Sequence, residues 1–243
     1  MKGRPITGVL AALAASFLLP QLAHAEMSDE DMCRNGLFPS QQEFHLATVA
    51  TTAPRLYFFD DWNGCPQKGA SCQKKGYVLP GDHLLLGKTR GEWTCAWYQG
   101  QAHETVGWVR SRDLAIQPDT EPQAADWDGK WTIYRNRGGI GISRKGSAWY
   151  VSGNAYWGSG DGTNLGYLAG ELKVRSRRAH VGGAMRDDAE DCGADLVRIG
   201  EFLIVHDNER CGGLNVRFDG VYTRAFTSAS RGGGSTGKAR PRS

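Results

Sequence analysis

The sequence lacks the short motifs that mark common catalytic and nucleotide-binding sites. It has no Gly-x-Ser-x-Gly, no His-Glu-x-x-His, no phosphate-binding glycine loop and no zinc-ligand spacing. After the first 25 residues it also lacks an apolar run long enough to cross a membrane as a helix. These absences predict a mature protein that is not an enzyme, has no transmembrane segment and needs neither a cofactor nor a metal.

An excess of charge of one sign is missing as well. The chain has 29 Lys and Arg against 26 Asp and Glu, a formal net charge of +3. Several of the basic residues lie at the two ends of the chain, namely Lys2, Arg4, Arg231, Lys238, Arg240 and Arg242. The body between them is slightly acidic and has no evident basic stripe, so we expect no nucleic-acid partner.

The first 25 residues have the three parts of a secretory signal peptide. Lys2 and Arg4 form a basic head, residues 9–19 form an apolar stretch too short for a membrane span, and Ala23-His24-Ala25 is a small-x-small cleavage site. We therefore expect cleavage after Ala25 and a mature protein that is periplasmic or secreted.

All six cysteines follow that cleavage site, and an exported chain meets an oxidising compartment. We therefore predict three disulfides rather than metal ligands or catalytic thiols. Cys192 and Cys211 flank a predicted hairpin with its tip at residues 200–201, which brings them together. The other four would pair within the first half of the chain. The preferred pairs are Cys65 with Cys72 and Cys33 with Cys95, while the sequence leaves the other pairings open.

The body of the chain divides into two β-rich blocks, and no convincing amphipathic helix interrupts them. The linker between them is polar and contains two prolines, and the tail is rich in Gly and Ser and expected to be disordered. The expected order is a lead-in at 26–45, a first block at 46–116, a linker at 117–126, a second block at 127–226 and a tail at 227–243. The predicted fold class is all-β, with two small barrels.

The first block has the strand and turn pattern of a small barrel. A strand ends in the turn Pro80-Gly81-Asp82, residues 91–98 alternate as a half-buried strand does, and Gly107-Trp108-Val109 precedes Asp113-Leu114. This pattern resembles the bacterial SH3-like domain of exported proteins, a barrel of five or six strands. The resemblance implies a module that binds the cell wall or a peptide. The opening at residues 51–57 and the insertion at residues 63–74 depart from that family.

Three aromatic residues of the first block, Tyr57, Trp62 and Trp97, are candidate ligand-binding residues. Aromatic faces stack on sugars and on peptides. The alternative is the core, since a small barrel needs large buried side chains, and we assign Trp108 there. Trp62 lies among polar residues of a predicted loop, so neither role is favoured for it.

The second block opens with Gly129-Lys130-Trp131 and ends with a strand at residues 218–224. A Gly-x-Trp on the first strand and an arginine on the last resemble the calycin superfamily of up-and-down barrels, which includes lipocalins, avidins and small bacterial protease inhibitors. The resemblance implies that Trp131 closes one end and that Arg224 packs across its indole and bonds to nearby carbonyls. Alternation predicts seven or eight strands, with a hairpin at Asp219-Gly220.

Three non-catalytic functions remain open. The first is binding in the cell envelope, where the SH3-like module would engage peptidoglycan or an extended peptide of an envelope protein. The second is inhibition of a secreted or periplasmic hydrolase through a barrel end loop such as residues 158–164. The third is carriage of a small apolar ligand inside the barrel, which its short strands disfavour.

One catalytic alternative comes from wall peptidases of the NlpC type. These enzymes use an Asp-Cys dipeptide and a histidine before Val-Gly, and the chain contains Asp191-Cys192 and His180-Val181-Gly182. In that family the cysteine opens a helix and precedes the histidine, whereas here the order is reversed and strand-like residues follow. We therefore expect Cys192 to be in a disulfide.

Overall fold

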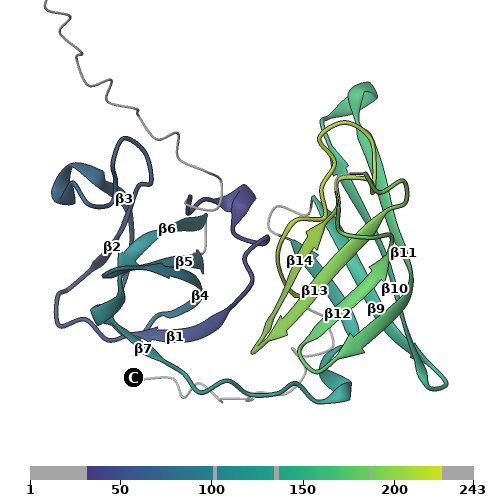
Figure 1. The fold of residues 1–243 in the computed structure, drawn as a ribbon, viewed down its shortest axis with the longest axis horizontal. Helices are drawn as coiled ribbons and strands as arrows, with labels where there is room; N and C mark the ends of the chain where they lie inside the picture. The colour runs from purple at the N-terminus through teal and green to yellow at the C-terminus, as the bar shows by residue number, and fades with distance from the viewer. Residues whose placement is uncertain (1–31, 101–102, 134–136, 187, 226–243) are drawn as a thin grey trace, which may run out of the picture.

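The structure is a computed structural model that describes residues 32–100, 103–133, 137–186 and 188–225 (Figure 1). The expected signal peptide and the expected tail lie outside these residues. The described chain is all-β, with two antiparallel sheets. Its only helical elements are short 3₁₀ turns, at Asn35–Leu37 (η2), Gly69–Cys72 (η3), Ser111–Asp113 (η4), Ala124–Asp126 (η5) and Gly160–Gly162 (η7).

The first sheet is open and has seven strands in the order β3-β2-β6-β5-β4-β1-β7, where the resemblance implied a barrel of five or six strands. Its strands are β1 (His45–Val49), β2 (Leu56–Phe59), β3 (Gln73–Val78), β4 (His83–Arg90), β5 (Trp93–Gln99), β6 (Glu104–Arg110) and β7 (Leu114–Ile116). Their apolar residues form a core of their own, which includes Phe58, Leu84, Leu86 and Val109. The pattern read from the sequence thus gives strands at the expected places.

The second sheet is a closed barrel of eight strands, each antiparallel to the next. The strands are β8 (Gly129–Ile133), β9 (Gly138–Lys145), β10 (Ala148–Trp157), β11 (Asn164–Arg175), β12 (Arg178–Gly182), β13 (Gly193–Ile199), β14 (Phe202–Asp207) and β15 (Gly220–Arg224). β15 closes the barrel by pairing with β8. The expected hairpin at Asp219-Gly220 is wrong: β14 ends at Asp207, and a loop at residues 208–219 precedes β15.

One end of the barrel is closed by Trp131 between two arginines. The indole is 1% exposed, and the Cζ atoms of Arg224 and Arg198 lie 4.6 and 4.8 Å from its ring centroid. Arg224 donates hydrogen bonds to the carbonyls of Asp126 and Asp128. This is the arrangement expected for Trp131 and Arg224.

Two further residues make this arrangement possible. Gly129 has a φ of 131°, and a Cβ there would lie 2.5 Å from Nη1 of Arg224, so glycine is required. Arg198, which the sequence did not suggest, donates to the carbonyls of Asp126 and Phe202, both at 3.0 Å. Burial, together with the charge of Arg224, lowers the pKa of Arg198 to about 10.

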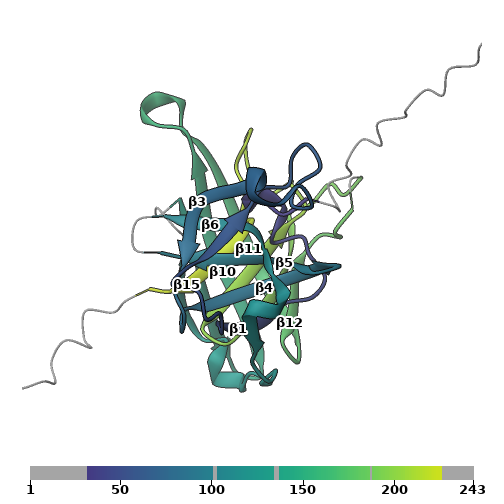
Figure 2. The ribbon, with the colours of Figure 1, turned by 90° about the vertical axis from the view of Figure 1, so that its left-hand side faces the viewer.

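The two sheets share a hydrophobic core. Apolar residues on the outer face of β13, β14 and β15 pack against the tryptophans of β5 and β6, and Figures 1 and 2 show the first sheet against this side of the barrel. The rings of Trp97 and Phe202 meet edge to face with centroids 5.4 Å apart. Phe38 and Phe44 are buried here too, so the expected polar lead-in contributes to this core.

The segment between the sheets runs without strands from residue 117 to residue 123 and contacts both of them. Asp119 accepts from Arg177 of the barrel at 2.9 Å and lies 3.2 Å from Nδ1 of His45 in the first sheet. This carboxylate therefore links the two sheets at the border of their common core.

Three disulfides complete the fold: Cys33–Cys95, Cys65–Cys72 and Cys192–Cys211. These are the preferred pairs of the sequence analysis. Disulfides persist in oxidising compartments, so the protein belongs in a location outside the cytoplasm. Within the described residues, no helix combines the length and the apolar character needed to span a membrane.

We predict that Phe202→Ala destabilises both sheets together, because it opens a cavity in their common core. The free energy of unfolding should fall by about 3–5 kcal/mol, with one cooperative transition in chemical denaturation. Leu214→Ala, at an exposed position, should change it by less than about 0.5 kcal/mol. Two separate transitions in the wild type, with the first sheet unaffected by Phe202→Ala, would contradict a common core.

Candidate functional site

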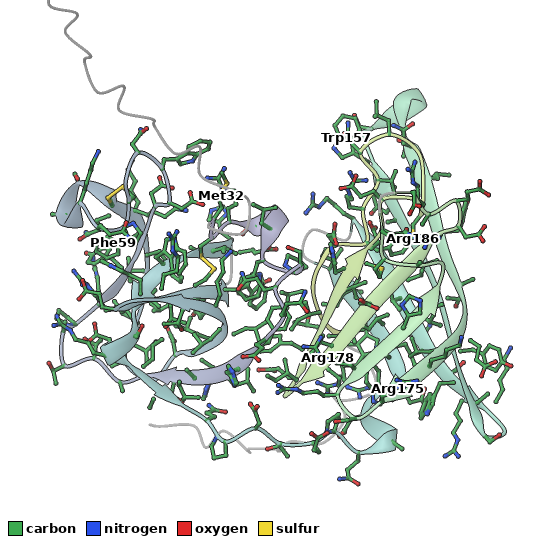
Figure 3. All side chains as sticks on the ribbon, viewed as in Figure 1. Met32, Phe59, Trp157, Arg175, Arg178 and Arg186 are labelled. Carbon is green, nitrogen blue, oxygen red and sulfur yellow. A yellow bond between two sulfur atoms is a disulfide. The ribbon has the colours of Figure 1, made fainter. Side chains whose placement is uncertain are left out.

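Exposed apolar side chains gather at one end of the barrel. We name this group the apolar rim, and its members are Tyr156, Trp157, Leu165, Tyr167 and Leu214. Tyr167 and Leu214 are 67% and 77% exposed. The turn between β10 and β11 stands beyond the ends of the other strands (Figure 1), and Trp157 lies at that end of the barrel (Figure 3).

The lengths of two strands place the rim. β10 has 10 residues and β11 has 12, so their hairpin extends past the shorter strands around it. Tyr156 pairs with Leu165, and Tyr167 pairs with Asn154. The residues that alternate with them, such as Ala155 and Leu168, are buried inside the barrel. Because strand side chains alternate, Tyr156, Leu165 and Tyr167 share the outer face.

The loop at residues 208–219 lies along β11 and brings Leu214 to the rim. The Tyr167 N–H donates to the Cys211 carbonyl at 2.8 Å, and the Asn164 side chain donates to the Leu214 carbonyl at 2.8 Å. A Cβ on Gly166 would lie 2.5 Å from the Cys211 carbonyl oxygen, so this close approach depends on glycine. The disulfide to Cys192 fixes the start of the loop to the neighbouring strand.

Two carboxylates anchor this loop at its base. Asp207 is 1% exposed and accepts from the N–H groups of Phe218 and Glu209. Asp219 accepts from the Asp207 N–H at 2.9 Å and lies 2.8 Å from Nδ1 of His206. Burial, and then the charge of Asp219, raise the pKa of Asp207. His206 looked isolated in the sequence, but in the fold it has a carboxylate partner.

Stability should depend on pH through His206. Its hydrogen bond to Asp219 raises its pKa above the ordinary 6.5, more than burial lowers it. A raised pKa means that the stabilisation is complete below pH 6.5 and is lost as pH rises through the folded-state value. We predict a melting temperature that falls as pH rises above 6.5, and less so in His206→Gln.

Asp219→Asn should flatten the same pH profile, because the amide keeps the hydrogen-bonding oxygen but not the charge. His103→Gln, at an exposed position before β6, serves as the control. Equal slopes in wild type and His206→Gln would show that this pair does not set the pH dependence.

A small groove opens beside the rim. It has a volume of about 180 Å³, and its lining includes the aromatic residues Tyr156 and Trp157 and the basic residues Arg137 and Arg217. Arg217 is held by Glu209 at 3.0 Å. The groove adds charged groups to an otherwise apolar end, which is the usual composition of a protein-binding surface with a polar border.

The two other candidate aromatics of the first sheet are accessible. Trp62 is 54% exposed in the loop after β2, and the guanidinium of Arg34 stacks on it at 4.1 Å while its Nε and Nη2 donate to the Asp61 carboxylate. Tyr57 is half-buried, and its ring meets Tyr77 at 5.8 Å. Arg55 covers Tyr77 at 4.3 Å, so each of the two candidate residues lies beside an arginine that stacks on an aromatic ring.

Trp97 is not available to a ligand. It is 2% exposed because it is enclosed between the first sheet and the barrel, where it meets Phe202. The predicted alternation along β5 is confirmed, but the barrel covers the face of β5 that was expected to line a ligand groove. Trp108 is fully buried, as expected.

The residues considered for catalysis have other partners. Cys192 is bonded to Cys211, and His180 lies 2.8 Å from Asp195 on the next strand. Among the described residues, no group of three or more His, Cys, Asp or Glu side chains has the geometry to hold a metal ion.

The loop at residues 158–164 was expected from the sequence to contact a partner, whereas the apolar rim around it was not expected. The sequence does contain a signal for the rim. Tyr156 and Trp157 precede the glycine-rich loop, and Leu165 and Tyr167 follow it. Large apolar residues on both faces of a hairpin predict an exposed apolar patch. No protein-family model, curated protein or solved structure significantly matches the chain.

Proposed function

We propose that this chain is a non-catalytic binding protein of an extracytoplasmic compartment, and that it binds a protein partner through the apolar rim. The observation that carries the proposal is the gathering of five large exposed apolar side chains at one barrel end. Contiguous apolar patches with aromatic residues are typical of protein interfaces. Burying each such side chain contributes about 1.5–3 kcal/mol.

The shape of this end favours a concave partner. A hairpin that extends beyond the barrel inserts into a cleft more readily than it packs on a flat surface, and the cleft of a secreted or periplasmic hydrolase is such a surface. The barrel interior is filled by large side chains such as Trp127, Trp131, Phe218 and Tyr222. That packing supports action at the rim over carriage of a ligand inside. The proposed activity is inhibition of a hydrolase.

We infer that the barrel is calycin-like and that the first sheet is SH3-like. The supporting observations are the stacking of Arg224 on Trp131 behind Gly129 and the meander of eight strands. For the first sheet, the support is the buried Trp108 in the Gly-Trp-Val strand β6. Both families include exported proteins with binding functions.

The rim proposal is tested with purified muramidases, amidases and endopeptidases that release dye from labelled peptidoglycan. We expect the mature protein to inhibit at least one of them. Tyr167→Ala with Leu214→Ala should weaken this inhibition at least about tenfold, the loss expected for central interface residues. Trp62→Ala is the matched control, because it removes an exposed aromatic elsewhere. No inhibition of any enzyme, or an equal loss in the control, would contradict the proposal.

A second candidate function is binding of peptidoglycan or an extended peptide by the first sheet. It is favoured by Trp62 beside Arg34 and by Tyr77 beside Arg55, since both stacks present an aromatic face. Sugars would stack on the rings, and stem-peptide carboxylates would pair with the guanidinium of Arg55, whereas that of Arg34 is held by Asp61.

Co-sedimentation with purified sacculi tests this second function. We expect the mature protein to pellet, and Tyr57→Ala with Trp62→Ala to leave most of it in the supernatant. The rim variants should pellet like the wild type. If neither set of variants changes the pelleted fraction, these aromatic residues do not bind the wall.

A further inference from the structure

A second surface feature lies at the other end of the barrel from the apolar rim. A groove of about 300 Å³ runs over the outer face of β11, β12 and β13. We name it the basic groove, and its charged lining residues are Lys173, Arg175, Arg178, His180 and Asp195. In Figure 3, Arg175 and Arg178 lie at the end of the barrel opposite Trp157.

The strand register concentrates positive charge in this groove. Arg175 pairs directly with Arg178, and Lys173 pairs directly with His180. Like charges directly opposite one another on neighbouring strands destabilise a sheet. The register therefore holds cations together at a cost in stability.

Nearby carboxylates do not neutralise these cations. Asp195 is bonded to His180, and Asp119 accepts from Arg177 on the adjoining turn. Arg178 donates to the Gln42 carbonyl, which carries no charge. Within the described part of the chain, the side chains of Lys173 and Arg175 form neither a hydrogen bond nor an ion pair. Three positive charges thus face a groove that a single carboxylate lines, which leaves an excess of two.

We propose that the basic groove binds a phosphate group with two or more negative charges, such as a phosphomonoester or a pyrophosphate. A phosphomonoester carries a charge of about −1.5 to −2 near pH 7, which matches the excess of positive charge in the groove. The planar guanidinium groups of Arg175 and Arg178 suit bidentate contacts with phosphate oxygens, and the groove has room for the group attached to the phosphate. The site is independent of the apolar rim.

The sequence carries a signal for this site that the overall charge conceals. Residues 173–180 read Lys-Val-Arg-Ser-Arg-Arg-Ala-His, with four Lys or Arg and no acidic residue. The turn at residues 176–177 folds this run back on itself, so β11 and β12 present its cations on one face. The expectation that the body has no basic stripe is therefore corrected at this hairpin.

Isothermal titration of the mature protein with pyrophosphate at low salt tests the proposal. We expect saturable binding that weakens as salt is added, because exposed charges are screened. Lys173→Gln with Arg175→Gln should weaken it at least tenfold. Neither side chain has a hydrogen-bond or ion-pair partner, so the melting temperature of the unliganded variant should equal or exceed that of the wild type. Arg186→Gln, at an exposed arginine paired with Asp188, is the matched control.

Further arms identify the source of the phosphate. Binding to vesicles that contain phosphatidic acid, but not to phosphatidylcholine alone, places the phosphate on a lipid headgroup, whereas binding of pyrophosphate only supports a soluble ligand. The proposal is overturned if pyrophosphate produces no binding heat, if Lys173→Gln with Arg175→Gln leaves the affinity unchanged, or if Arg186→Gln lowers the affinity equally. Tighter binding of a single-stranded oligonucleotide than of pyrophosphate would overturn it in favour of a nucleic-acid surface.

Discussion

The packing of the first sheet on the barrel is the constraint on which the other features depend. Trp97 and Phe202 lie at its centre, and Phe38 and Phe44 of the lead-in extend it. Because this contact covers the outer face of β14 and of the second half of β13, a partner has to use what remains exposed. Among the described residues, exposed apolar side chains gather at the rim at the β10–β11 end, and positive charge gathers at the β11–β12 turn. The interface between the sheets therefore decides which barrel surfaces are available.

The barrel itself acts as a rigid support rather than as a container. Trp131 closes one end between two arginines, and Tyr222 donates a hydrogen bond to the Phe218 carbonyl within the interior. An interior filled to this degree fixes the strands in one register. The loop at residues 208–219 is in turn fixed by Asp207, Asp219 and the Cys192–Cys211 bond. The rim is thus pre-organised, which lowers the entropic cost of binding a partner.

Much of this fold follows from local rules in the sequence. Alternation with a period of two located the strands, and Gly129-Lys130-Trp131 with Arg224 indicated the closed end, since each feature depends on residues within a strand. Trp97 was ambiguous because alternation shows that one face of β5 is apolar but not what covers it. The apolar run at residues 202–205 indicates what covers Trp97, because a strand that is apolar on both faces is buried on both faces. The pairing of Arg175 with Arg178 depends on the length and register of the turn between β11 and β12, which cannot be predicted from composition.

Natural sheets usually place opposite charges across from one another. In this barrel, Arg178 of β12 instead lies across from Arg175 of β11, whereas two residues further along β12 His180 lies across from Asp195 of β13. The rim presents the same kind of departure, because Tyr156 and Leu165 are large apolar residues on the outer face of paired strands, where polar ones are the rule. Both departures lie at hairpin ends that the first sheet does not cover. Local features that lower stability or solubility in an otherwise well-packed fold are expected at functional sites. The rim and the basic groove lie at opposite ends of the barrel (Figure 3), so the two departures occupy separate surfaces of one small domain.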